Sequence, residues 1–144
     1  MKRAIAFGLF AAVSLMAGGA VTAHHSFAAE YDSNKPITLA GVVTKVEWMN
    51  PHVYFYLDVK DAGGASANWA VEGGAPNTLY RAGWRKESLK AGDHLTVHGY
   101  LSRDGGKLVN MRDAILPDGR NVLAGQNDGG PTPTLPAATR PPGR

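Results

Sequence analysis

Apolar and polar side chains alternate strictly between His52 and Lys60. The apolar set is Val53, Phe55, Leu57 and Val59, and the polar set is His52, Tyr54, Tyr56 and Asp58. A period of two is that of a β-strand with one buried face, whereas a helix would scatter both sets around its surface. The segment is therefore predicted to be a strand whose apolar face covers a core.

Four further segments have strand-like patterns. They are Ile37–Trp48, Asn68–Glu72, His94–Leu101 and Lys107–Leu116. Turn signals rich in Gly, Pro, Asn and Asp separate them. In the first segment we expect Val42, Val46 and Trp48 to face the core, and in the last we expect a bend or bulge at residues 111–113.

A short helix is predicted between the third and fourth strands. Pro76 suits a first helical turn, and Gly83 suits a left-handed stop. The order of strand, strand, strand, helix, strand, strand predicts a mainly β fold: a five-stranded OB-like Greek-key barrel. A five-stranded sandwich is the alternative.

The first 23 residues have the pattern of a secretory signal peptide. Lys2 and Arg3 precede an apolar run from Ala4 to about Ala20, and small residues end it at Ala23. The alternative is an uncleaved anchor, for which the run is short. We expect cleavage after Ala23, a periplasmic or secreted product, and no membrane association afterwards.

The remainder divides into three parts. Residues 24–36 are polar with little periodicity and are expected to form an N-terminal arm. Residues 37–125 hold the predicted OB-like domain. Residues 126–144 contain Gly129-Gly130 and a series of prolines, and are expected to be a disordered tail.

Composition excludes several classes of protein. The chain has no cysteine, which excludes disulfides, thiolate metal sites and cysteine nucleophiles. All of its acidic residues lie after residue 23, whereas two of its 15 basic residues lie before it. The mature chain is therefore nearly neutral, and no nucleic-acid partner is expected.

Cleavage after Ala23 would make His24 the first residue, with His25 next to it. The amine and imidazole of one N-terminal histidine can chelate Cu(II), and nitrogen ligands favour copper over harder ions. His52 could add a further nitrogen. The metal site predicted from the sequence is therefore His24, His25 and His52, with copper as the possible cofactor. The alternative is that the two terminal histidines are simply solvated.

The polar face of the second strand is a second candidate binding site. The rings of Tyr54 and Tyr56 could stack on a sugar or a base. With Asp58 and His98, this face is the alternative site, for an oligosaccharide, a peptide or a partner protein. The alternative is that these residues only suit an exposed strand face. His94 and His98 lie about 13 Å apart at ~3.3 Å per residue, so they are not expected to share one ion.

The sequence contains no recognisable catalytic constellation. Its acidic residues are scattered, and there is no nucleophile elbow, phosphate loop or HExxH motif. We expect a small binding protein without enzymatic activity, with an unknown small ligand or periplasmic protein as partner. A small copper oxidase-type catalyst is the enzymatic alternative.

Several segments resemble a family of small exported bacterial proteins classed as a domain of unknown function. The segments are HHSFAAEYD (His24–Asp32), KPITLAGVVTKVEWMNPH (Lys35–His52), PNTLYRAGW (Pro76–Trp84) and LKAGD (Leu89–Asp93). The resemblance covers nearly all of the mature domain. It implies a periplasmic location and an OB-like barrel, and it implies no activity.

Overall fold

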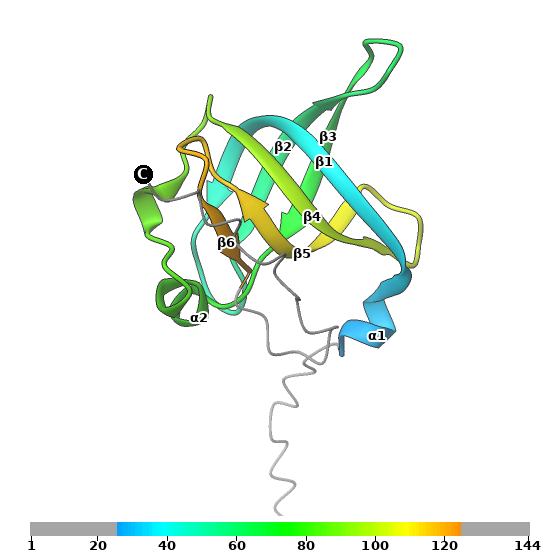
Figure 1. The fold of residues 1–144 in the computed structure, drawn as a ribbon. Helices are drawn as coiled ribbons and strands as arrows, with labels where there is room; N and C mark the ends of the chain where they lie inside the picture. Colours follow the sequence, from blue (N-terminus) through cyan, green and yellow to red (C-terminus); the bar gives the residue numbers. More distant parts are fainter. Residues whose placement is uncertain (1–25, 125–144) are drawn as a thin grey trace, which may run out of the picture.

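The computed structural model describes residues 26–124, which form a mainly β fold (Figure 1). The strands are β1 (Tyr31–Glu47), β2 (Tyr54–Lys60), β3 (Ser66–Glu72), β4 (His94–Ser102), β5 (Leu108–Ile115) and β6 (Asn121–Leu123). The helices are α1 (Phe27–Glu30), α2 (Pro76–Arg81) and a 3-10 turn, η1 (Lys86–Ser88). Two short α-helices and six strands replace the one helix and five strands expected.

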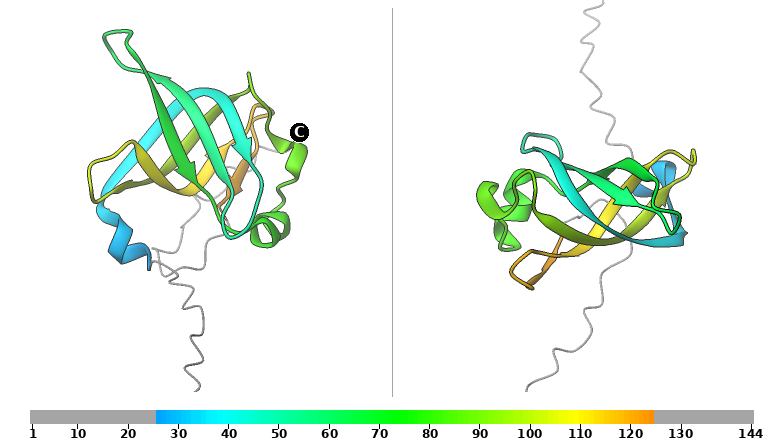
Figure 2. Two further views of the ribbon diagram at one scale, coloured as in Figure 1. Left: turned by 180° about the vertical axis from the view of Figure 1, so that it is seen from behind. Right: turned by 90° about the horizontal axis from the view of Figure 1, so that it is seen from above.

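All six strands belong to one sheet, in the order β3-β2-β1-β4-β5-β6. Neighbours in this order pair antiparallel, and β3 also pairs with β5 in parallel. β1 is long enough to serve two partners, since residues 31–42 pair with β4 and residues 42–47 pair with β2. Because β1 passes from one partner to the other, the sheet curls around its inner face, as Figure 2 shows.

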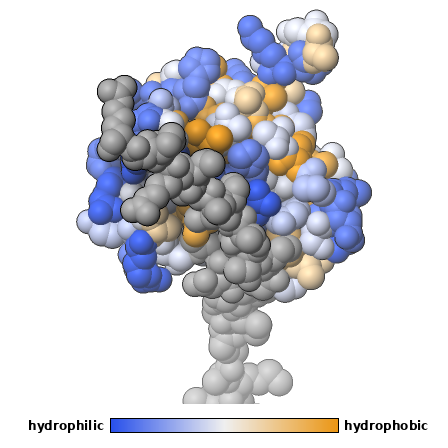
Figure 3. All heavy atoms as spheres, viewed as in Figure 1, coloured by the Kyte–Doolittle hydropathy of each residue, from blue (hydrophilic) through white to orange (hydrophobic). Residues whose placement is uncertain are grey.

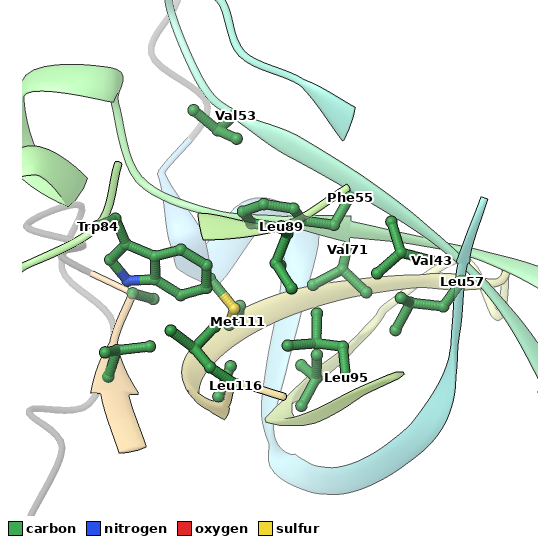
Figure 4. Close-up of a cluster of buried hydrophobic side chains, with 14 of the residues drawn as sticks. Val43, Val53, Phe55, Leu57, Val71, Trp84, Leu89, Leu95, Met111 and Leu116 are labelled. Carbon is green, nitrogen blue, oxygen red and sulfur yellow. The ribbon is translucent and has the colours of Figure 1, made fainter. Parts of the chain in front are cut away.

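The core fills the inner face of the curled sheet (Figure 4). Phe55 and Trp84 are fully buried, and their rings stack with centroids 5.3 Å apart. The indole Nε1 of Trp84 donates a hydrogen bond to the carbonyl oxygen of Leu123 at 2.8 Å. Trp84 therefore ties the segment after α2 to β6, while Trp48 and Trp69 pack at the margin of the core.

The predicted phase of β2 is confirmed, because Phe55 and Leu57 are buried and Tyr54 and Tyr56 are not. The predicted phase of β1 is wrong in its first half. Val43 is buried, whereas Val42 is only half-buried. The pairing with β2 shifts by one residue between Val43 and Lys45. This β-bulge returns Val46 and Trp48 to the core side.

The bulge predicted in the fifth strand is confirmed. His98 pairs with Asp113 and Gly99 pairs with Met111, so Arg112 is the extra residue. β6 was not predicted. It is three residues long, too short for a period to be visible, and only Val122 in it is buried.

The N-terminal arm predicted for residues 24–36 is wrong over its described part. α1 covers Phe27–Glu30, and β1 begins at Tyr31. The aromatic rings of Phe27 and Tyr31 are buried. Their burial holds this segment against the rest of the fold, although its sequence shows little periodicity. The predicted signal peptide, His24, His25 and the predicted tail lie outside the described residues. No helix in residues 26–124 has the length and apolar character needed to cross a membrane.

Candidate functional site

A buried carboxylate lies at the end of β3. Glu72 is only 5% exposed. The hydroxyl of Tyr31 donates a hydrogen bond to its Oε2 atom, and Nδ1 of His52 contacts its Oε1 atom. One carboxylate thus holds both an aromatic hydroxyl and an imidazole.

Strand geometry brings these three residues together. Val71 points into the core, so Glu72 points to the opposite face of β3. Its cross-strand partner on β2 is Tyr54, and His52 lies two residues before Tyr54. Tyr31, at the start of β1, covers this outer face and removes Glu72 from water.

The electrostatics of the cluster follow from this burial. Burial raises the pKa of Glu72, and the hydrogen bond from Tyr31 and the charge of His52 oppose that effect. Burial also raises the pKa of Tyr54 to about 12, with further contributions from the negative charges of Glu72 and Glu30. The pKa of Tyr31 is raised by burial and by its hydrogen bond to Glu72. The cluster is therefore desolvated, and its tyrosines lie beside acidic side chains.

The start of the described chain is anchored beside this cluster. The Phe27 ring lies 5.7 Å from the Tyr31 ring and 5.6 Å from the Tyr100 ring. Arg103 holds α1 from the other side: its backbone N–H donates to the Glu30 carbonyl and its Nε to the Ala28 carbonyl, both at 2.9 Å. These contacts therefore hold α1, and with it Phe27, in place beside the cluster.

The predicted metal ligands are only partly placed. His52 lies in the cluster with 22% of its side chain exposed. Within residues 26–124, no group of three or more His, Asp or Glu side chains is arranged to hold a metal ion. The described residues therefore contain one of the three predicted ligands, His52, together with the carboxylate of Glu72 that contacts it.

The predicted Tyr54/Tyr56 face is less open than expected. The Tyr56 hydroxyl donates to Glu47 at 2.9 Å, and the ammonium of Lys45 lies 5.3 Å from the Tyr56 ring. Asp58 accepts a hydrogen bond from Asn68 at 2.8 Å. Figure 3 shows the opposite side of the molecule, where β4 and β5 lie in front, and hydrophilic and hydrophobic residues are mixed on the part of it that is not drawn in grey.

His98 does not join that face. It lies on β4, opposite Asp113 of β5, and its Nδ1 contacts an Asp113 carboxylate oxygen at 2.6 Å. His94 is exposed at the start of the same strand. The two histidines are separate, as their spacing predicts.

Sequence reasoning missed Tyr31 and the role of Glu72. Glu72 looked like one of several scattered acids. A signal was nonetheless present: Glu72 ends the third predicted strand, and antiparallel pairing across the hairpin places it near the start of the second, beside Tyr54 and His52. Nothing in the local pattern links Tyr31 to Glu72.

Replacing Tyr31 by Phe is expected to lower the free energy of unfolding by about 1.5–3 kcal/mol. The change keeps the buried ring and removes one hydrogen bond to a desolvated carboxylate. Urea unfolding of the variant gives the value. Tyr80→Phe is the matched control, because Tyr80 is 57% exposed and should change stability little. Equal effects of the two changes would contradict the importance of the Tyr31 hydrogen bond.

Comparison with known families gives a match over residues 12–110, to a family of unknown function (DUF6152). Comparison with curated proteins finds no match. The family match spans more than half of the chain and includes α1, the Tyr31–Glu72–His52 cluster and most of the sheet. The chain therefore belongs to DUF6152, a family of unknown function.

Proposed function

We propose that this is an exported, non-catalytic metal-binding protein whose mature N-terminus completes a copper site at His52. In this proposal His24 supplies its amine and imidazole, and His52 and His25 supply further nitrogen. Glu72 orients His52. The observation that carries the proposal is the contact between His52 Nδ1 and the buried Glu72 carboxylate.

The contact with Glu72 prepares His52 for a metal. A carboxylate that contacts Nδ1 fixes the orientation of an imidazole, and it favours the tautomer that binds metal through Nε2. Metal-binding histidines in proteins commonly have such a carboxylate partner, which fixes the ring and increases its basicity. A bound cation nearby would in turn stabilise the ionised form of Glu72, whose pKa is raised by burial.

The anchored start of α1 makes the terminal histidines suitable partners. Phe27 contacts Tyr31, and Tyr31 contacts Glu72. His25 and His24 are two and three residues before Phe27 in the chain, and two extended residues span about 7 Å. So short a connection to a residue that takes part in this chain of contacts supports the proposed site.

The strand pairing supports an OB-like barrel as the scaffold of this site. We infer a five-stranded Greek-key barrel of β1 to β5, with β6 as an addition. The inference rests on the parallel β3–β5 pairing, since it gives each of these strands two neighbours. α2 and η1 occupy the connection between β3 and β4, where an OB fold has its helix.

Calorimetric titration with Cu(II) tests the function on the mature chain beginning at His24. We expect one tight site. Three Ala residues added before His24 displace the amine and should weaken binding by at least about ten-fold, as should His24→Ala. A shorter extension is avoided, because it would place His25 or His24 third in the chain, where a histidine and the terminal amine themselves chelate Cu(II). Glu72→Gln should weaken it by about 10–100-fold through loss of the carboxylate that orients His52.

His94→Ala is the matched control, since His94 is an exposed histidine away from the cluster. It should bind copper as the unaltered chain does. If the extended and native termini bind equally, or if neither binds, the terminal site does not exist. The Tyr54/Tyr56 face would then be the leading candidate, for an oligosaccharide, a peptide or a partner protein.

A further inference from the structure

A second buried carboxylate organises a separate polar cluster on β4 and β5. The Asp113 side chain is 5% exposed, and each of its oxygens has a partner. Oδ1 contacts Nδ1 of His98 at 2.6 Å, and Oδ2 accepts a hydrogen bond from Nε of Arg112 at 2.7 Å. Asp113 therefore fixes an imidazole and a guanidinium side by side.

The bulge at Arg112 makes this arrangement possible. Consecutive residues of a regular strand point to opposite faces, so Arg112 and Asp113 would normally be separated by the sheet. Here Arg112 is the extra residue between the pairs Gly99–Met111 and His98–Asp113. A bulge of this kind redirects a side chain, and it puts the guanidinium on the same side as His98. The backbone N–H of Ala124 donates to the Arg112 carbonyl at 2.9 Å, which holds the bulge in place.

The outer ends of both side chains border a hollow. His98 and Arg112 line it with Pro36, Ile37, Thr38 and Gly99, and its volume is about 260 Å³. The side chains of His98 and Arg112 are 28% and 35% exposed. Asp113 contacts one edge of each group, and Tyr100 is a second hydrogen-bond partner of the Arg112 guanidinium. Nε2 of His98 and the remaining N–H groups of Arg112 are the donors for a ligand.

We propose that this hollow binds a small oxyanion, such as a carboxylate or a phosphate group. The planar guanidinium of Arg112 matches two oxygens of either group. His98 binds in its imidazolium form, donating through Nδ1 to Asp113 and through Nε2 to the anion. Thr38 pairs with His98 across β1 and β4, so its hydroxyl lies on the same face and serves as a further donor. A cation is disfavoured by the charge of Arg112.

The test is an NMR titration of the full mature chain with sodium acetate and, separately, with inorganic phosphate. Ionic strength is held constant, and the pH is about 6, where imidazole is largely protonated in model peptides. We expect saturable shifts of the His98 ring and the Arg112 Nε–H with at least one of the two anions. Saturation with acetate alone indicates a carboxylate ligand, and saturation with phosphate indicates a phosphate-like ligand.

Two pairs of variants separate this site from general charge effects. Arg112→Gln and His98→Gln should weaken binding by at least about ten-fold, because each removes a charge-assisted hydrogen bond. Arg120→Gln is matched to the first, because Arg120 also pairs with a neighbouring carboxylate, Asp118, at 2.7 Å. His94→Gln is matched to the second. Both controls should bind within about two-fold of the unaltered chain, since a surface charge contributes little at a distance.

Non-saturable shifts in the unaltered chain, or equal losses in the control variants, would overturn the proposal. Thermal melts establish that each variant is folded. If Arg112→Gln is not folded, Arg112→Lys replaces it. That variant keeps the positive charge and loses the planar fork, so it should also lose at least about ten-fold in affinity.

Discussion

Replacing Phe55 by Ala should lower the free energy of unfolding by about 3–5 kcal/mol. Phe55 is fully buried in the centre of the core, where its ring stacks on Trp84. The change loses the burial of the ring and leaves a cavity between β2 and the segment after α2, and both effects destabilise the fold. Chemical denaturation followed by Trp fluorescence or circular dichroism measures the loss.

Tyr56→Ala is the control on the neighbouring position of the same strand. Tyr56 is half-buried on the outer face, and its hydroxyl bonds Glu47 near the surface. The expected loss is well below that for Phe55. A loss at Tyr56 equal to or larger than that at Phe55 would mean that the two faces of β2 are reversed.

Replacing Gly99 by Ala should destabilise the fold by about 3 kcal/mol or more. A Cβ atom at Gly99 would lie 2.2 Å from the backbone oxygen of Asn110 and 2.6 Å from Cγ1 of Val109. Neither contact can be relieved by rotating a flexible side chain, because one is backbone and the other is buried. β4 and β5 would have to separate next to the Arg112 bulge.

Gly63→Ala is the control for the Gly99 change, since both add one methyl group. Gly63 lies in the β2–β3 loop, and the nearest atom to its added Cβ is Asp61 Oδ1 at 3.3 Å. Its melting temperature should change little, because the loop is exposed and can adjust. Comparable losses for the two variants would show that the close approach of β4 and β5 at Gly99 is not the reason why Gly99→Ala destabilises the fold.

The sequence was sufficient to predict the regular part of the fold. β2 could be assigned with its phase because its alternation is unbroken, and α2 could be placed between Pro76 and Gly83, whose φ of +98° provides the expected left-handed stop. The inner phase of β1 could not be predicted, because the bulge after Val43 breaks the period within one strand. β6 was missed because three residues carry no periodic signal.

The candidate sites were predicted less well, for a physical reason. His52 was recognised because histidine is an uncommon residue with few structural roles. Its partner Glu72 and the covering residue Tyr31 are 41 positions apart, and only the pairing of whole strands brings them together. Asp113 and Arg112 share a face only because of a bulge. Such long-range placements are properties of the complete sheet.

The parallel pairing of β3 with β5 also affects the association of one protein molecule with another through strand edges. An unpaired strand edge offers N–H and C=O groups that can recruit a strand from a second chain. Among residues 26–124, β6 is the only strand paired on one side alone, and it is three residues long. So short an edge is a poor template for strand addition, and the β3–β5 pairing closes residues 70–72 of β3 to a strand from a second chain.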